Sequence, residues 1–254
     1  MTDQQPLRTS FRQGNNEQVR HQATLQVQEA RESGDAAGEV EGLYALARVA
    51  LRDHDLTAAE DLAQRALTVA QQTGERALEE RPRHVLAAVA RLAGDHARAV
   101  VLYQASIDLN RALGNQVTVH TESHNLAMIE LQLGHIDRAR LLMSEGHDRV
   151  RQGGLHDFVP YLGLAGAALA LADDDVHRAA RLIGFTDKAF ARLGQVPDPD
   201  DASELAMMRE RVADELDAET VQTELATGAA WSLADAFGGT WPRASESMRE
   251  DDDA

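Results

Sequence analysis

Cysteine is absent from the sequence, which excludes disulfides, thiolate metal sites, iron–sulfur clusters and cysteine nucleophiles. The chain also lacks an apolar run of about 18 residues, the length that a membrane-spanning helix requires. Its polar start carries no hydrophobic signal segment. We therefore expect a cytoplasmic protein with no membrane partner.

Positive charge is scarce, because 25 Lys and Arg residues stand against 42 Asp and Glu residues, giving a formal charge of −17. This balance argues against direct binding of nucleic acid, which needs a basic face to neutralise phosphates. Lysine occurs once, at Lys188, a composition typical of bacterial genomes rich in G and C. Aromatic residues make up only 4% of the chain, yet 43% of its 254 residues are hydrophobic, enough for a core.

Catalytic sequence motifs are missing as well. The chain has no phosphate-binding loop, no G-x-G-x-x-G fingerprint and no G-x-S-x-G nucleophile turn. Its many carboxylates are spread along the sequence without a distinctive pair. We therefore expect no enzymatic activity and no cofactor.

What the sequence does contain is a forty-residue period. Glycines recur at this spacing at Gly34, Gly74, Gly114, Gly154 and Gly194. Alanines follow the same period at Ala47, Ala87, Ala127 and Ala167, and again at Ala59, Ala99, Ala139 and Ala179. A polar turn position lies between them, at Asp55, Asp95, His135 and Asp175. Such self-similarity is the signature of a repeat architecture.

Each period predicts two helices. Leu43, Leu46, Ala47 and Ala50 form one apolar stripe at helical spacing, and a second stripe begins at Leu56. Every second helix should end at the periodic glycine, which adopts a left-handed C-cap without penalty. Alanine should recur where the helices approach one another closely.

The pattern resembles the tetratricopeptide repeat. The small residues of that family's signature match Ala47, Ala59 and Ala66 in the first unit, and the segment Ser123–Arg140 is the most family-like stretch. A forty-residue period is longer than the usual repeat of about 34 residues, as in bacterial regulator and kinesin-light-chain-like variants. The resemblance implies an all-α, right-handed superhelical solenoid of helix–turn–helix repeats with a C-terminal helical cap.

Four segments are expected along the chain. These are a flexible N-terminus (1–13), tetratricopeptide-like repeats with a leading helix at about 15–33 and four helix pairs (14–194), a helical C-terminal cap (195–243) and a disordered acidic tail (244–254). The prolines of Gln-Val-Pro-Asp-Pro-Asp-Asp (residues 195–201) predict a turn-rich linker before cap helices at Ala202–Leu216 and Ala218–Thr227.

The last repeat and the cap also resemble the C-terminal repeat region of bacterial LuxR/MalT-type transcriptional regulators. The matching stretches are Arg-Ala-Ala-Arg-Leu-Ile-Gly-Phe-Thr-Asp-Lys-Ala (residues 178–189) and Gly-Ala-Ala-Trp-Ser-Leu-Ala-Asp-Ala (residues 228–236). The chain departs from those regulators because it lacks both their ATPase and their DNA-binding domain. The resemblance implies a sensor or scaffold module without its output domains.

In such a solenoid the first helices would line a concave groove. The register places there a set of aromatic, cationic and amide residues and one methionine: Tyr44, Arg48, Arg52, His84, Arg91, His124, Asn125, Met128 and Tyr161. A cationic lining on an anionic protein would concentrate an acidic peptide or protein segment. The alternative is that these arginines are ordinary surface residues paired with nearby carboxylates.

Asn125 interrupts an apolar column, since Val85 and Ala165 occupy the positions forty residues away. A carboxamide can pair with the backbone of an extended peptide, as the resemblance implies for this helix position. A structural hydrogen bond between neighbouring helices would explain it equally well.

His120 and His124 lie four residues apart and could share a metal ion, but no third ligand is visible and no metal is expected. Trp231, Trp241 and Phe237 are interpreted as packing residues of the cap.

These observations favour a non-enzymatic protein- or peptide-binding module, an adaptor or a regulatory sensor. Two alternatives stay open: a structural protein that forms a homodimer through its terminal helices, and an accessory regulator of transcription that acts through a partner.

Overall fold

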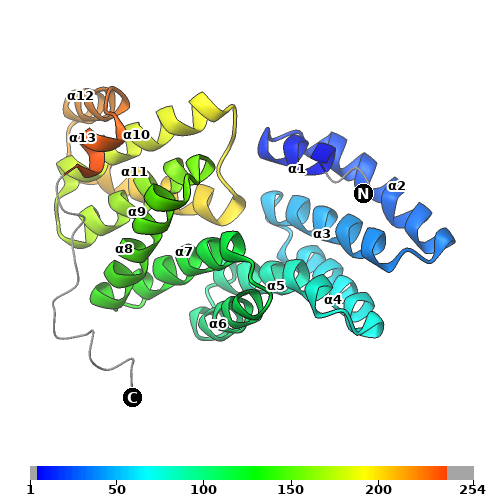
Figure 1. Ribbon diagram of the computed structural model, residues 1–254. Coiled ribbons are helices and arrows are strands. Elements are labelled where there is room, and N and C mark those ends of the chain that lie inside the picture. The colour runs from blue at the N-terminus through cyan, green and yellow to red at the C-terminus, as the bar shows by residue number, and fades with distance from the viewer. Residues whose placement is uncertain (1–4, 239–254) are drawn as a thin grey trace, which may run out of the picture. The chain divides into compact units, whose positions relative to one another are not determined.

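The computed structural model describes residues 5–238, and every regular element among them is a helix (Figure 1). The chain divides into two compact units. Unit 1 contains residues up to 122 together with residues 194–202, and unit 2 contains residues 123–193 and the residues from 203 onward. The predicted run of repeats, residues 14–194, extends over both units.

The helices of unit 1 are α1 (Gln5–Arg12), α2 (Asn16–Ser33), α3 (Ala36–Arg52), α4 (Leu56–Thr73), α5 (Glu80–Leu92) and α6 (His96–Ala112), with a 3-10 turn, η1, at Arg76–Glu79. Those of unit 2 are α8 (Ile136–Gly153), α9 (Val159–Ala172), α10 (Val176–Leu193), α12 (Ala218–Ala229) and α13 (Leu233–Phe237), with a 3-10 turn, η2, at His156–Phe158. Helices α7 (Gln116–Gln132) and α11 (Pro199–Glu215) run from one unit into the other.

The forty-residue period fixes where the helices begin and end. At the starts of α3, α4, α6 and α10 an aspartate side chain accepts a hydrogen bond from a backbone N–H of the first turn: Asp35, Asp55, Asp95 and Asp175. These contacts satisfy donors that a helix N-terminus leaves unpaired. At the other end, Gly74 closes α4 in the left-handed conformation, with φ of 75°. The periodic glycines therefore act as predicted.

A second periodic position in the left-handed region lies between the helices of each pair. Gly94 and Gly134 occupy it with φ of 75° and 79°, and the equivalent residues His54 and Asp174 adopt φ of 60° and 57°. Gly14, between α1 and α2, has the same register with φ of 79°, so the position is glycine in three of five cases and was not predicted from the sequence. The turn geometry is therefore kept even where a side chain makes it unfavourable.

Within unit 1, α3 packs against both α2 and α4, and α5 packs against α4 and α6. The fully buried alanines Ala47, Ala59, Ala63 and Ala66 lie at these contacts. Small side chains allow close helix approach, which explains how so few aromatic residues suffice for the core.

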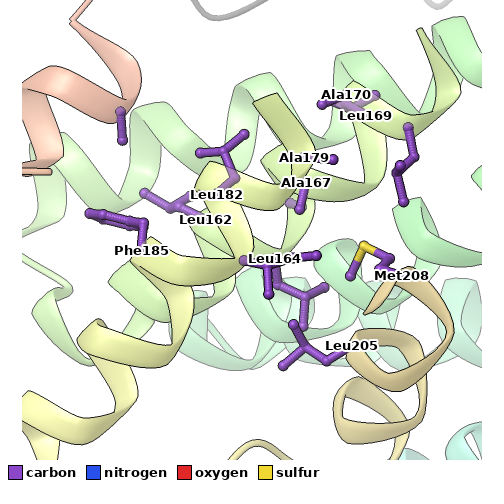
Figure 2. Packing of buried hydrophobic residues seen from close by; sticks show 14 of the residues in the cluster. Leu162, Leu164, Ala167, Leu169, Ala170, Ala179, Leu182, Phe185, Leu205 and Met208 are labelled. Carbon is purple, nitrogen blue, oxygen red and sulfur yellow. The ribbon is translucent and has the colours of Figure 1, made fainter. Parts of the chain in front are cut away.

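The core of unit 2 is built around α9, the most apolar helix of the described chain. Its leucines and alanines pack against α10 and against Leu205 and Met208 of α11, as Figure 2 shows. Phe185 of α10 meets Phe237 of α13 edge to face, with ring centroids 5.9 Å apart. Trp231 packs at the margin of the same cluster, whereas Trp241 lies outside the described residues.

The N-terminal segment differs from its expected flexible state, because Gln5–Arg12 form α1. Leu7 and Phe11 lie four residues apart on this helix and are both buried, which gives it an apolar stripe to pack against its neighbours. Helix α1 contacts both α2 and α3. The leading helix therefore has partners on the chain itself.

The cap helices begin close to their predicted positions. Helix α11 starts at Pro199, three residues earlier than expected, because proline is tolerated in the first turn of a helix. Residues 239–243 of the predicted cap and the predicted tail, residues 244–254, lie outside the described part of the chain.

Candidate functional site

Five of the residues predicted to line a groove lie on α3 and α5 of unit 1. We call Tyr44, Arg48, His84 and Arg91, together with Arg81 of α5, the cationic face. The guanidinium carbons of Arg48 and Arg81 lie 5.6 Å and 5.2 Å from the centroid of the Tyr44 ring. The tyrosine ring thus lies within cation–π distance of two guanidinium groups, which stabilises the contact.

Arg52, predicted for the same face, anchors α1. It donates hydrogen bonds to the carbonyl of Phe11, at 2.8 Å, and to Oδ1 of Asn16, at 3.0 Å. The guanidinium groups of Arg48 and Arg52 both lie 3.7 Å from the centroid of the Phe11 ring. Phe11 is therefore enclosed by two arginines, and this part of the face is covered by the chain's own N-terminal helix.

A nine-residue segment, Gly194–Ala202, supplies carboxylates to the cationic face; we call it the strap. The Nη2 atom of Arg48 lies 2.5 Å from Oδ1 of Asp198. The Nη1 atom of Arg91 lies 2.7 Å from Oδ2 of Asp200, and its Nη2 atom lies 4.0 Å from Asp201. The arginines predicted to bind an acidic segment thus bind one that belongs to the same chain.

The two arginine contacts differ in burial. The Arg91 and Asp200 side chains are 2% and 8% exposed, whereas those of Arg48 and Asp198 are 14% and 28% exposed. Breaking a buried pair leaves an uncompensated charge in a poor solvent, so the Arg91 contact should be the firmer one. The backbone adds one bond, from the N–H of Val196 to the carbonyl of Arg12, at 2.9 Å.

Beneath the face lies a buried polar cluster. Nδ1 of His84 lies 3.1 Å from Oε2 of Glu122, which is fully buried, and the hydroxyl of Ser106 donates to Oε1 of Glu122 at 2.7 Å. Burial alone would lower the pKa of His84, but the charge of Glu122 and its hydrogen bond raise the pKa to about 10. His84 therefore carries a proton and a positive charge at neutral pH.

Two further groups in this region have shifted pKa values. Burial raises the pKa of Glu41, an effect that its ion pair with Arg81 opposes. Tyr103 is fully buried, and burial followed by the charge of Asp200 raises the pKa of its hydroxyl well above the usual value. The tyrosine is thus neutral and offers no acid–base chemistry near neutral pH.

The other predicted residues lie on unit 2. The ring of His124 meets the ring of Tyr161 edge to face at a centroid distance of 5.8 Å, and Tyr161 meets Phe190 at 5.3 Å. Asn125 and Met128, on α7, are 3% and 2% exposed, and Met128 belongs to the hydrophobic core. Burial favours a supporting role for Asn125 and Met128 over direct contact with a ligand.

The predicted histidine pair falls on the boundary between the units, with His120 in unit 1 and His124 in unit 2. Among the described residues, no group of three or more His, Asp and Glu side chains could hold a metal ion. None of the described helices combines the length and the apolarity that crossing a membrane requires.

Sequence reasoning missed Phe11, Asp198, Asp200 and Asp201 as members of the site. The three aspartates lie in the stretch whose prolines predict a turn-rich linker. The sequence separations of 150 and 109 residues that join Arg48 to Asp198 and Arg91 to Asp200 exceed any local pairing rule. Only the opposite charge of the two segments could have suggested the contact.

Comparison with known proteins gives a family match within unit 1. Residues 38–112 match the tetratricopeptide repeat family. The matched stretch extends from within α3 to the end of α6 and includes the helices that carry the cationic face. Tetratricopeptide repeats are a non-catalytic module that generally mediates protein–protein interaction.

The chain is also similar to a solved structure, described as the crystal structure of BtubC (BKLC) from P. vanneervenii. The sequences are 22% identical, the match covers 91% of this chain and 95% of that one, and the TM-score is 0.58. At this identity the likeness shows a shared helical repeat fold. A comparison with curated proteins gave no significant match. The resemblance of the last repeat and cap to LuxR/MalT-type regulators stays a prediction.

Proposed function

We propose that the chain is a non-enzymatic protein-binding module, an adaptor or regulatory sensor, whose cationic face receives an acidic segment of a partner protein. One observation carries the proposal: the face already holds carboxylates, those of Asp198 and Asp200, through Arg48 and Arg91. Its groups are therefore positioned for carboxylate recognition.

The charge distribution supports the same partner chemistry. The chain carries a formal charge of −17, yet α3 and α5 bring the guanidinium groups of Arg48, Arg81 and Arg91 together. A local cluster of guanidinium groups on an anionic protein attracts acidic segments. Guanidinium groups also pair with carboxylates more strongly than neutral donors do.

Unit 2 is assigned a secondary part in this proposal. The His124 and Tyr161 rings, which are partly exposed, form a separate candidate contact surface on unit 2, while Asn125 and Met128 would support α7 from within the core. The partner is a protein or peptide, and neither nucleic acid nor membrane is part of the proposal.

The test is a selection of random displayed peptides on the immobilised full chain. We expect the recovered peptides to be rich in Asp and Glu, and their binding to weaken as salt is raised, because salt screens ion pairs. Replacing Arg81 by Gln should weaken binding, since the Arg81 side chain is 36% exposed and accessible to a partner.

Arg65→Gln is the matched control, because Arg65 is an exposed arginine on α4 away from the cationic face. Recovered peptides without acidic residues, or equal binding by the Arg81→Gln and Arg65→Gln variants, would contradict the proposal.

A further inference from the structure

We infer that the strap is an internal ligand of the cationic face, and that a partner binds by replacing it with an acidic segment of the same pattern, Asp-x-Asp-Asp. This inference rests on the function proposed above and specifies its ligand. Asp198, Asp200 and Asp201 are the carboxylates that set the pattern.

The way in which the strap is held makes replacement feasible. Residues 195–198 are in no helix or strand, and side-chain pairs with Arg48 and Arg91 hold the segment to α3 and α5. The contact at Asp198 is more exposed than the contact at Asp200. Opening should therefore begin at Asp198, because water reaches this ion pair more easily than the pair at Asp200.

Because the strap is covalently connected to the rest of the chain, it competes strongly with a free peptide for the cationic face. A tethered segment acts at an effective concentration on the order of millimolar, so a free peptide with the same contacts binds the intact chain weakly. Loss of one strap carboxylate removes part of this competition. The affinity for an acidic peptide should then rise, although the variant removes a stabilising ion pair from the protein.

The spacing of the strap carboxylates matches the positions of Arg48 and Arg91. Arg48 contacts the first carboxylate, and Arg91 contacts the second, two residues later, with the third at 4.0 Å. In the strap, Pro199 follows Asp198, and α11 begins there, so Asp200 and Asp201 lie in the first turn of a helix. Acidic side chains stabilise a helix N-terminus, and a partner segment that starts a helix would gain the same contribution.

The experiment measures binding of a fluorescent peptide with the strap sequence, Gly-Gln-Val-Pro-Asp-Pro-Asp-Asp-Ala, to the full chain by fluorescence anisotropy. Asp198→Asn should bind this peptide about tenfold more tightly than the unaltered chain, the effect of one charge-assisted contact. A peptide with all three aspartates replaced by asparagine should bind neither protein.

Asp53→Asn is the matched control, because Asp53 forms an exposed ion pair with Arg20 in the same unit but belongs to no part of the strap. Its affinity for the peptide should equal that of the unaltered chain. Circular dichroism of each variant establishes that the helices are retained.

A second measurement needs no variant. The strap peptide, added to the unaltered chain, should increase hydrogen exchange at the amide of Val196, whose N–H is bonded to the carbonyl of Arg12. The asparagine peptide should leave this exchange unchanged.

The outcomes separate this inference from the proposed function. Equal peptide affinity of Asp198→Asn and the unaltered chain, with no change in exchange at Val196, overturns the inference while leaving an acid-binding face. Selection of acidic peptides that lack the strap pattern also overturns the inference alone. If no acidic peptide binds any of these proteins, both the inference and the proposed function fail.

Discussion

Gly184 of α10 and Gly228 of α12 each lie at the point where their helix meets the backbone of the other. A Cβ atom at Gly184 would lie 2.0 Å from the carbonyl oxygen of Leu225, and one at Gly228 would lie 1.7 Å from the carbonyl oxygen of Arg181. Neither oxygen belongs to a flexible side chain. The close crossing of these two helices therefore requires glycine on both sides.

Gly184→Ala and Gly228→Ala should each destabilise unit 2, because the two helices must separate to admit a methyl group. Overpacking of this kind lowers the free energy of unfolding by about 1–3 kcal/mol. Urea denaturation, followed by circular dichroism, measures the change. Gly153→Ala is the control, since its nearest neighbour would be 3.5 Å away, and an unchanged or increased stability is expected there.

His54→Gly should stabilise the protein. His54 is an exposed residue with φ of 60°, in the position that Gly94 and Gly134 occupy in the next two periods. A left-handed conformation costs an L-residue about 1–2 kcal/mol, and glycine removes this penalty. Thermal unfolding should shift upward for His54→Gly and downward for the reverse change, Gly94→His. A downward shift for His54→Gly would show that the side chain makes a compensating contact.

The sequence predicted structural features that depend on residues close together in the chain, but not those that depend on contacts between distant segments. The periodic glycines act within one turn of the chain, so their spacing predicted where the second helices end. The left-handed conformation at His54 was not predicted, because the residue type at this position changes between repeats. Gly184 and Gly228 gave no signal, since close approach of two helices depends on tertiary packing alone.

For the candidate site, the sequence predicted the residues on the helices but not the segment that contacts them. Helical register placed Tyr44, Arg48, His84 and Arg91 on first helices, where the structure has them. It could not show that Asp198 and Asp200 return to the same face, because charge complementarity does not specify a path for the chain. Nor could it foresee the burial of Asn125, which depends on packing around α7.

Protein stability should depend on the protonation of His84. Its pKa lies at about 10 in the folded state because the charge of Glu122 outweighs the effect of burial, while Tyr44 and Arg48 also face the ring. A group with a raised folded pKa contributes stability that is complete below its unfolded pKa, near 6.5, and is lost as pH rises towards about 10. The free energy of unfolding should therefore fall across this range.

Glu122→Gln should remove most of this pH dependence, because it removes the charge that raises the pKa of His84. Urea titrations at several pH values compare the two proteins. A slope that persists unchanged in Glu122→Gln would assign the effect to another group.

The enclosure of Phe11 by two arginines predicts that Phe11→Leu weakens the attachment of α1. Leucine keeps most of the buried apolar volume, but it loses two cation–π contacts, each at 3.7 Å. We expect the free energy of unfolding to fall by about 1–2 kcal/mol. Limited proteolysis near Gly14 should become faster. Leu7→Met, a volume-conserving change on the same helix, should have a smaller effect.

The strap has a consequence for how the protein is made. Residues 194–202 belong to unit 1, yet they follow α10 in the sequence, and α10 belongs to unit 2. The aspartates that pair with Arg48 and Arg91 therefore leave the ribosome long after the helices that carry these arginines. Until then Arg48 and Arg91 lack only the carboxylates that the strap supplies. Nascent chains stopped before residue 198 should thus hold an exposed cationic face, open to any acidic segment nearby.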